Sequence, residues 1–244
     1  MAKAYFVSTT YRAESLLKIP DNHTKDLKKI DGLIALIIFI AQFLFIFFAN
    51  FLMNTFPQKT YYMIMILFVV VFYAYLLIIL KSRKQSILSI GLNKNHIPYT
   101  ITLAITLIIG LVSFFYKNLS ILEYWLFQLI AVASFEEILL RGFLYPRLAQ
   151  LFYGKNKYIY VFLLMAVLFS VPHAILPTLQ SLPRMQNGLE VVKFAGSILL
   201  NRFYKDFSFS LLMVILYVET ENVTYSIIFH ALINFLPEFL GLWF

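Results

Sequence analysis

Three short motifs with acidic, imidazole or amide side chains lie within otherwise apolar stretches of the sequence. They consist of Glu136, Glu137 and Arg141, then Phe169 and His173, and finally His230 and Asn234. An ionisable side chain at the centre of a membrane helix costs about 2.5–3.5 kcal/mol on insertion scales. Such a residue is a functional candidate, so the three motifs are candidate parts of one site.

The glutamate pair offers one carboxylate for chemistry and one for support. Adjacent residues of a helix point about 100° apart, so Glu136 and Glu137 cannot face the same direction. Glu137 and Arg141 are four residues apart and can pair on one helix face. Glu136 is then left to face a cavity, where a carboxylate suits a general base that acts on water. The alternative is that all three residues form a structural charge cluster between helices.

His173 can lie at the same height as Glu136 if the helices around them form a hairpin. With a turn at residues 154–157, both residues are about 25–30 Å from the turn at the rise of an α-helix. Side chains at one height can share one water molecule. The alternative is that His173, which follows Pro172, is a structural polar group with partners on neighbouring helices.

His230 and Asn234 are four residues apart and therefore share one face of the last apolar run. An imidazole and an amide on one face can donate hydrogen bonds to a developing oxyanion, or they can bind a metal ion. The alternative is that both residues provide hydrogen bonds between helices.

The composition is that of a membrane protein. Of the 244 residues, 61% are hydrophobic and 13% are charged, and the mean hydropathy is +0.81. These values exclude an ordinary soluble enzyme, a disordered chain and a fibrous repeat. The net charge of +8 comes from basic residues between apolar runs, which indicates membrane topology and anionic lipid rather than nucleic acid. The absence of cysteine excludes disulfides, a thiol nucleophile and Cys-based zinc sites.

Eight apolar runs indicate the membrane-spanning segments. They are 33–53, 61–80, 99–116, 119–140, 158–176, 189–200, 207–218 and 223–243. Eight crossings place most basic residues on the side of both termini, as the positive-inside rule requires. The expected fold is therefore all-α, a polytopic transmembrane bundle of about eight spans. The alternative is seven spans, with 183–206 as a re-entrant or interfacial segment.

No internal repeat or interdomain linker divides the chain. We expect residues 1–32 to form a cytoplasmic N-terminal tail and residues 33–244 to form a single transmembrane domain. The lysine-rich, cysteine-free composition indicates a multi-pass protein of a bacterial plasma membrane, with both termini in the cytoplasm.

In this order and on separate apolar runs, the patterns EExxxR, FxxxH and HxxxN resemble the CAAX-protease and bacteriocin-processing (CPBP, or Abi) family of intramembrane proteases. The type II CAAX prenyl endopeptidases belong to this family. The resemblance covers about residues 119–243, which form the expected catalytic core. One departure is Leu140, where bacterial members often carry Phe, and another is the length of 180–206 between the second and third motifs.

The resemblance implies an endopeptidase that hydrolyses a peptide bond in a membrane-associated peptide or protein, which would be its substrate, with the lipid bilayer as its surroundings. The implied roles are water activation by Glu136 and His173, oxyanion stabilisation by His230 and Asn234, and support of the site by Glu137, Arg141 and Phe169.

A bound metal is not expected, because no helix carries two histidines at the i, i+4 spacing of HExxH sites. Zinc does accept glutamate and histidine ligands, however. If a divalent metal such as zinc is present, Glu136, His173 and His230 would be its ligands.

Two other classes of function remain open. A non-proteolytic bacteriocin-immunity or scaffold protein could share the fold, because a fold does not imply an activity. A proton-coupled transporter also uses buried Glu and His residues, but the sequence shows no pair of inverted halves.

Overall fold

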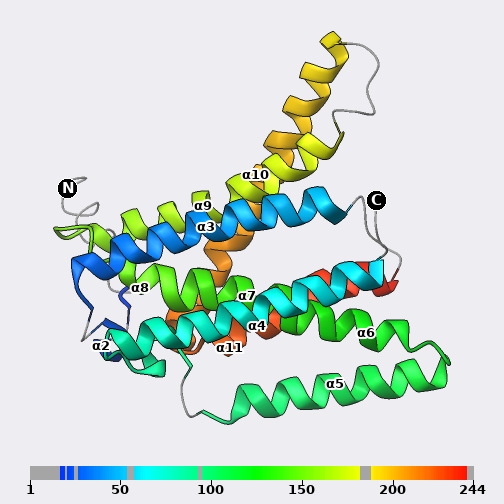
Figure 1. Cartoon of the computed structure of the whole chain (residues 1–244), viewed down its shortest axis with the longest axis horizontal. Helices are drawn as coiled ribbons and strands as arrows, with labels where there is room; N and C mark the ends of the chain where they lie inside the picture. Colours follow the sequence, from blue (N-terminus) through cyan, green and yellow to red (C-terminus); the bar gives the residue numbers. More distant parts are fainter. Residues whose placement is uncertain are drawn as a thin grey trace, which may run out of the picture.

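The computed structural model shows an all-helical chain, with no strand among the residues that it describes (Figure 1). These residues are 17–19, 21–24, 27–53, 58–92, 95–181 and 188–240. Half of the expected tail, residues 1–16, lies outside them. The predicted helical bundle is confirmed.

Seven long helical segments make up the described part of the bundle. Six are single helices, namely α3 (Lys29–Met53), α4 (Gln58–Ser82), α5 (Ile97–Phe115), α9 (Lys157–Ser181), α10 (Gly188–Thr220) and α11 (Val223–Leu240). The seventh, called the central segment below, consists of α6 (Ser120–Phe127), η2 (Gln128–Ala133), α7 (Ser134–Glu137), η3 (Ile138–Leu144) and α8 (Tyr145–Leu148). Its parts η2 and η3 are π-helical.

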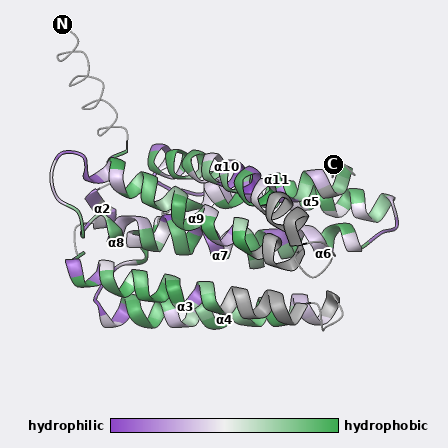
Figure 2. Ribbon diagram, turned by 90° about the horizontal axis from the view of Figure 1, so that it is seen from above, coloured by the Kyte–Doolittle hydropathy of each residue, from purple (hydrophilic) through white to green (hydrophobic). Residues whose placement is uncertain are grey.

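The central segment forms the core of the bundle. In Figure 2, α7 and α8 lie between the layer of α3 and α4 and the layer that contains α10 and α11. In agreement, η3 packs against α3 and α10, and η2 packs against α4 and α11. Every residue from 137 to 149 is buried. A helix that is surrounded by protein must be mainly apolar, because a buried polar side chain is costly unless it has a hydrogen-bond partner. In agreement, 138–149 contain only two charged side chains, Arg141 and Arg147.

Three of the described helical stretches are long and apolar enough to cross a membrane. They are Thr60–Ser82, Ile97–Phe115 and Lys157–Ile175. Much of the surface of these stretches is not covered by protein, as is expected of helices that face lipid.

The helix between residues 188 and 220 differs from the two separate segments that the sequence predicts there. The two apolar runs 189–200 and 207–218 lie in one continuous helix, α10, rather than in two spans. The polar stretch between them, 201–206, contains neither Gly nor Pro, so nothing in it interrupts the helix. As a result, the start of α3 and the end of α11 lie at opposite ends of the bundle, not at the same end (Figure 1).

Two arginines that the sequence indicates only as topological charges have buried partners. Arg83 Nε donates to Asp31 Oδ1 at 2.8 Å, and Asp31 is 3% exposed. Arg147 is buried and donates to the carbonyl oxygen of Phe143 at 3.0 Å and to Gln85 Oε1 at 2.5 Å. Through these bonds, the residues that directly follow α4 are connected to α3 and to the central segment.

The short helix α2 (Asp21–Thr24) is fixed to the same end of the bundle by His23. The His23 ring is 1% exposed, stacks on Tyr217 of α10, and has Nδ1 2.7 Å from the Tyr217 hydroxyl. Burial lowers the pKa of His23 to about 4, because a buried imidazolium loses its hydration.

The buried histidine predicts that the stability of the fold depends on pH. As the pH falls through 6.5 toward 4, the unfolded chain binds a proton at His23 that the folded protein does not bind, so the stability falls. We expect the melting temperature in detergent to be lower at pH 5.5 than at pH 7.5, and His23→Gln to reduce this difference. The exposed His96 provides the control, since His96→Gln should leave the difference unchanged. Equal pH dependence in wild type and His23→Gln would contradict the burial.

Close packing at Gly142 leads to a second prediction. A Cβ atom at Gly142 would lie 2.5 Å from the backbone oxygen of Ile90, in the 3₁₀-helix η1 (Ile87–Ile90). Backbone cannot move aside as a side chain can, so Gly142→Ala should destabilise the protein by about 1–3 kcal/mol. Gly110→Ala is the matched control, because a Cβ there has no neighbour within 4 Å. Thermal unfolding of both variants in detergent measures the difference, and equal melting temperatures would contradict the close approach.

Candidate active site

Three helical elements bring the predicted acid–base residues together. Glu136 lies on α7, His173 on α9 and His230 on α11. Glu136 Oε2 is 3.6 Å from His173 Nε2 and 3.8 Å from His230 Nε2. This oxygen is buried and has no hydrogen-bond partner among the described residues. The prediction that Glu136 and His173 lie at one height is confirmed.

A cavity of about 440 Å³ lies beside these three side chains, between η2, α7, α9, α10 and α11. Its polar lining residues are Gln128, Glu136, His173, Lys205, Asp206, His230 and Asn234. All four residues for which the sequence predicts a direct role in catalysis, Glu136, His173, His230 and Asn234, therefore line this cavity. Glu136 faces this space as predicted, with 16% of its side chain exposed.

The second glutamate, Glu137, is fully buried and joins two of its neighbours. Its Oε1 accepts a hydrogen bond from Arg141 at 3.1 Å, the predicted i, i+4 pair, and another from His230 Nδ1 at 2.8 Å. Arg141, also fully buried, donates in addition to the hydroxyl of Ser210 on α10 at 2.9 Å. With a carboxylate accepting from Nδ1, the Nε2 of His230 is directed toward Glu136.

Phe169 and His173 form a second unit on α9. The His173 ring stacks on the Phe169 ring, with 4.2 Å between the ring centroids, and Nδ1 lies 2.8 Å from the Phe169 carbonyl oxygen. A carbonyl oxygen only accepts, so Nδ1 of His173 donates. The guanidinium of Arg141 lies 4.9 Å from the centre of the Phe169 ring, a cation–π contact that links this unit to the Glu137 network.

Asn234 is held at the wall of the cavity by Gln128 of η2. Asn234 Nδ2 donates to Gln128 Oε1 at 3.1 Å. An amide group has two N–H donors, so one remains for a ligand in the cavity. His230 and Asn234 both line the cavity from α11, in agreement with their predicted common face.

Residues 118–236 match the model of a known family, the type II CAAX prenyl endopeptidases called Rce1-like. The matched stretch of 119 residues, just under half of the chain, is called the Rce1-like domain here. A comparison with curated proteins and one with solved structures found no match. The Rce1-like domain includes all seven residues that the motifs single out, and the resemblance to CAAX proteases noted in the sequence is confirmed. This family supports a protease of the CAAX type in a membrane.

The side chains of the Rce1-like domain do not form a metal site in the described structure. Among the described residues, no group of three or more His, Asp or Glu side chains is arranged to hold a metal ion. Glu136, His173 and His230 do have suitable donor atoms, with Glu136 Oε2 at 3.6 and 3.8 Å from the two imidazole nitrogens, and they would be the ligands of a bound zinc ion.

Sequence reasoning missed several residues of the site. Lys205 and Asp206 lie in the expected connection between two spans, but they line the cavity. Gln128 also lines the cavity, and it bridges two helices through its bond to Asn234. Ser210, the partner of Arg141, carries no motif. One signal was available for Gln128, since it is a polar residue within an apolar run.

The buried ion pair predicts a strong and non-additive effect on stability. Arg141→Met leaves the Glu137 carboxylate buried with His230 as its remaining partner, and should destabilise the protein by about 3–5 kcal/mol. The double variant Glu137→Gln/Arg141→Met removes both charges and should be more stable than Arg141→Met alone. Arg202→Met, at an exposed position of α10, serves as the control. Thermal unfolding in detergent gives the comparison, and strictly additive effects would contradict the pairing.

Proposed function

We propose that the protein is an endopeptidase that hydrolyses a peptide bond in a membrane-associated peptide or protein, using a water molecule activated by Glu136 and His173. The observation that carries this proposal is the position of Glu136 Oε2. It is a buried carboxylate oxygen without a hydrogen-bond partner among the described residues, and it lies within 4 Å of imidazole nitrogens from two other helices.

The separation between Glu136 and His173 suits a shared water molecule. At 3.6 Å the two atoms are beyond the length of a good direct hydrogen bond, and a polar pair at this distance is commonly bridged by water. Since Nδ1 of His173 donates to the Phe169 carbonyl, Nε2 of the neutral ring is an acceptor that faces Glu136. Both groups can therefore accept a proton from water in the gap.

His230 and Asn234 are suited to stabilise the oxyanion. Asn234 retains one N–H donor beyond its bond to Gln128. His230 donates through Nδ1 to Glu137, so its Nε2 is a donor only when the ring is protonated. An imidazolium beside Glu136 and an amide on the same helix face would then place two donors at the cavity wall, where negative charge develops.

The reaction follows from these positions. The water oxygen attacks the carbonyl carbon of the scissile bond while a proton passes from water to the Glu136–His173 pair. The carbonyl oxygen becomes an oxyanion that accepts hydrogen bonds from His230 and Asn234. The C–N bond then breaks, and the proton passes from the pair to the departing amine, which leaves a carboxylic acid and an amine as products.

The surroundings of the site favour a substrate that enters from the bilayer or its interface. Glu136 and His173 also border a small apolar cavity of about 40 Å³ on the opposite side, with Phe39 and Phe43 of α3 among its lining residues. The reacting groups thus lie between an apolar wall and the polar cavity, in a chain with helices apolar enough to span a membrane. We infer a multi-pass protein of a plasma membrane whose substrate is a membrane-tethered peptide or protein.

Replacement of the proposed base tests the mechanism. Glu136→Gln keeps the size of the side chain and removes its charge, so we expect at least a hundredfold loss of cleavage, within the roughly 10²–10⁴ that acid–base catalysis contributes. Peptidomics of cells that express wild type or Glu136→Gln would identify peptides that depend on the carboxylate, and a synthetic version of one such peptide gives the rate with purified protein.

Glu219→Gln is the matched control, because Glu219 is an exposed glutamate outside the cavity. It should cleave like wild type, and all variants should retain the melting temperature of a folded protein. Wild-type cleavage by purified Glu136→Gln would refute the mechanism. A cellular phenotype that survives Glu136→Gln while cleavage is lost would favour the scaffold function instead.

A further inference from the structure

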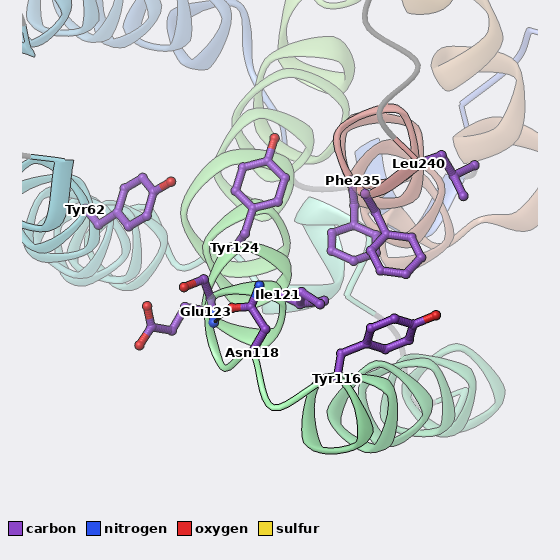
Figure 3. A pocket seen from close by; sticks show the side chains of 10 residues that line it. Tyr62, Tyr116, Asn118, Ile121, Glu123, Tyr124, Phe235 and Leu240 are labelled. Atoms are coloured by element: carbon purple, nitrogen blue, oxygen red, sulfur yellow. Dashed lines mark hydrogen bonds between the residues drawn. The ribbon is translucent and has the colours of Figure 1, made fainter.

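A second and larger cavity lies at the end of the bundle where α5 is connected to α6 and where α11 ends. Its volume is about 750 Å³. Figure 3 shows that Glu123 and Asn118 lie between the rings of Tyr62 and Tyr116 in this view. Glu123 precedes Glu136 by 13 residues in the central segment, which is about 20 Å along a helix. The cavity is therefore separate from the proposed catalytic site.

The polar side of this cavity is suited to a cation with an organic body. Of the described residues that line the cavity, Glu123 alone is charged, and its carboxylate has no ion pair within the part of the chain that the structure describes. Tyr62, Tyr116 and Tyr124 add aromatic faces and hydroxyl groups. A carboxylate among aromatic rings attracts ammonium groups through charge and through cation–π interactions. Among the described lining residues there is no cationic side chain to attract an anionic ligand.

An apolar cavity of about 210 Å³ adjoins the polar one. The two share Ile121, Phe235 and Phe239 as lining residues, so they are neighbours in one groove. The described residues that line this second cavity are all apolar, and they come from α5, α6 and α11. The groove thus combines a polar, negatively charged end with an apolar slot. This combination is complementary to an amphiphilic ligand with a cationic group at one end.

We propose that this groove binds a phospholipid whose headgroup ends in an ammonium group, such as phosphatidylethanolamine. The ammonium lies against Glu123 and the tyrosine rings, and part of one acyl chain lies along α5 and α11. This site is additional to the proposed proteolysis and does not depend on it.

The bilayer is the source of the ligand because the apolar slot opens along a helix that faces lipid. The helix α5 is one of the stretches that are apolar enough to cross a membrane. Its side chains Leu107, Ile108 and Leu111 are each about 60% exposed, and of these Ile108 lines the slot. A lipid can therefore enter the slot from the side of the bundle, without passing through water.

Binding of two lipids with the same acyl chains tests the headgroup. Protein purified in detergent is titrated with phosphatidylethanolamine or with phosphatidylglycerol, and bound lipid is counted by native mass spectrometry. We expect wild type to bind phosphatidylethanolamine at least fivefold more tightly. Glu123→Gln, at an exposed position where folding is not at risk, should reduce this preference to less than twofold. Equal binding of both lipids by wild type, or an unchanged preference in Glu123→Gln, would overturn the proposal.

A pair of tryptophan variants tests the slot. Ile108→Trp fills the apolar cavity and should weaken binding of both lipids at least fivefold. Leu107→Trp is the matched control, because Leu107 is equally exposed on the same helix and lines neither cavity. Should both variants bind like wild type, the acyl chain does not lie in the slot and the proposed site is wrong.

Discussion

The buried carboxylate of Glu137 is the interaction on which the rest of the candidate site depends. It is fully buried, and a lone charge in such a place costs several kcal/mol. Arg141, one helical turn later, and His230 on α11 both donate hydrogen bonds to this carboxylate. Arg141 also donates a hydrogen bond to Ser210 on α10. A buried charge that loses its partner would destabilise the fold, so these bonds hold α10 and α11 against the central segment in one arrangement. The site is thus positioned mainly by the free-energy penalty of leaving one of these charges unpaired, rather than by the net stabilisation that the intact network provides.

The direction of Glu136 follows from the fixed position of its neighbour. Glu137 begins a stretch of thirteen consecutive buried residues, whereas 16% of the Glu136 side chain remains exposed toward the cavity. The boundary between dry core and cavity therefore passes between two adjacent glutamates, and helix geometry alone separates their roles. Glu137 accepts hydrogen bonds from Arg141 and His230 through Oε1, whereas Glu136 Oε2 faces two imidazole nitrogens at 3.6 and 3.8 Å without a hydrogen bond among the described residues. Two identical side chains acquire different chemistry from their surroundings.

The sequence was informative wherever contacts depend on spacing along one helix or across one hairpin. The pair Glu137–Arg141 and the common height of Glu136 and His173 are of this kind. Contacts between helices that are distant in sequence leave no periodic signal, so the bond from Arg141 to Ser210 could not be foreseen. The continuity of α10 was missed for a related reason. Polar residues at 201–206 suggest a loop in a membrane protein, but here they line a cavity or face outward while the backbone stays helical.

The two cavities share α11 as a wall, and adjacent residues of that helix face different spaces. Asn234 lines the proposed catalytic cavity, and Phe235 lines both parts of the proposed lipid groove. The bond between Gln128 and Asn234 lies where the central segment and α11 meet, one helical turn from Tyr124, which stacks on Phe235. A lipid in the groove would therefore contact the helix that carries Asn234, the proposed oxyanion donor. Since a displacement of about 1 Å at such a donor can change a rate by 10²-fold, the lipid environment of this protein belongs to the physical description of its chemistry.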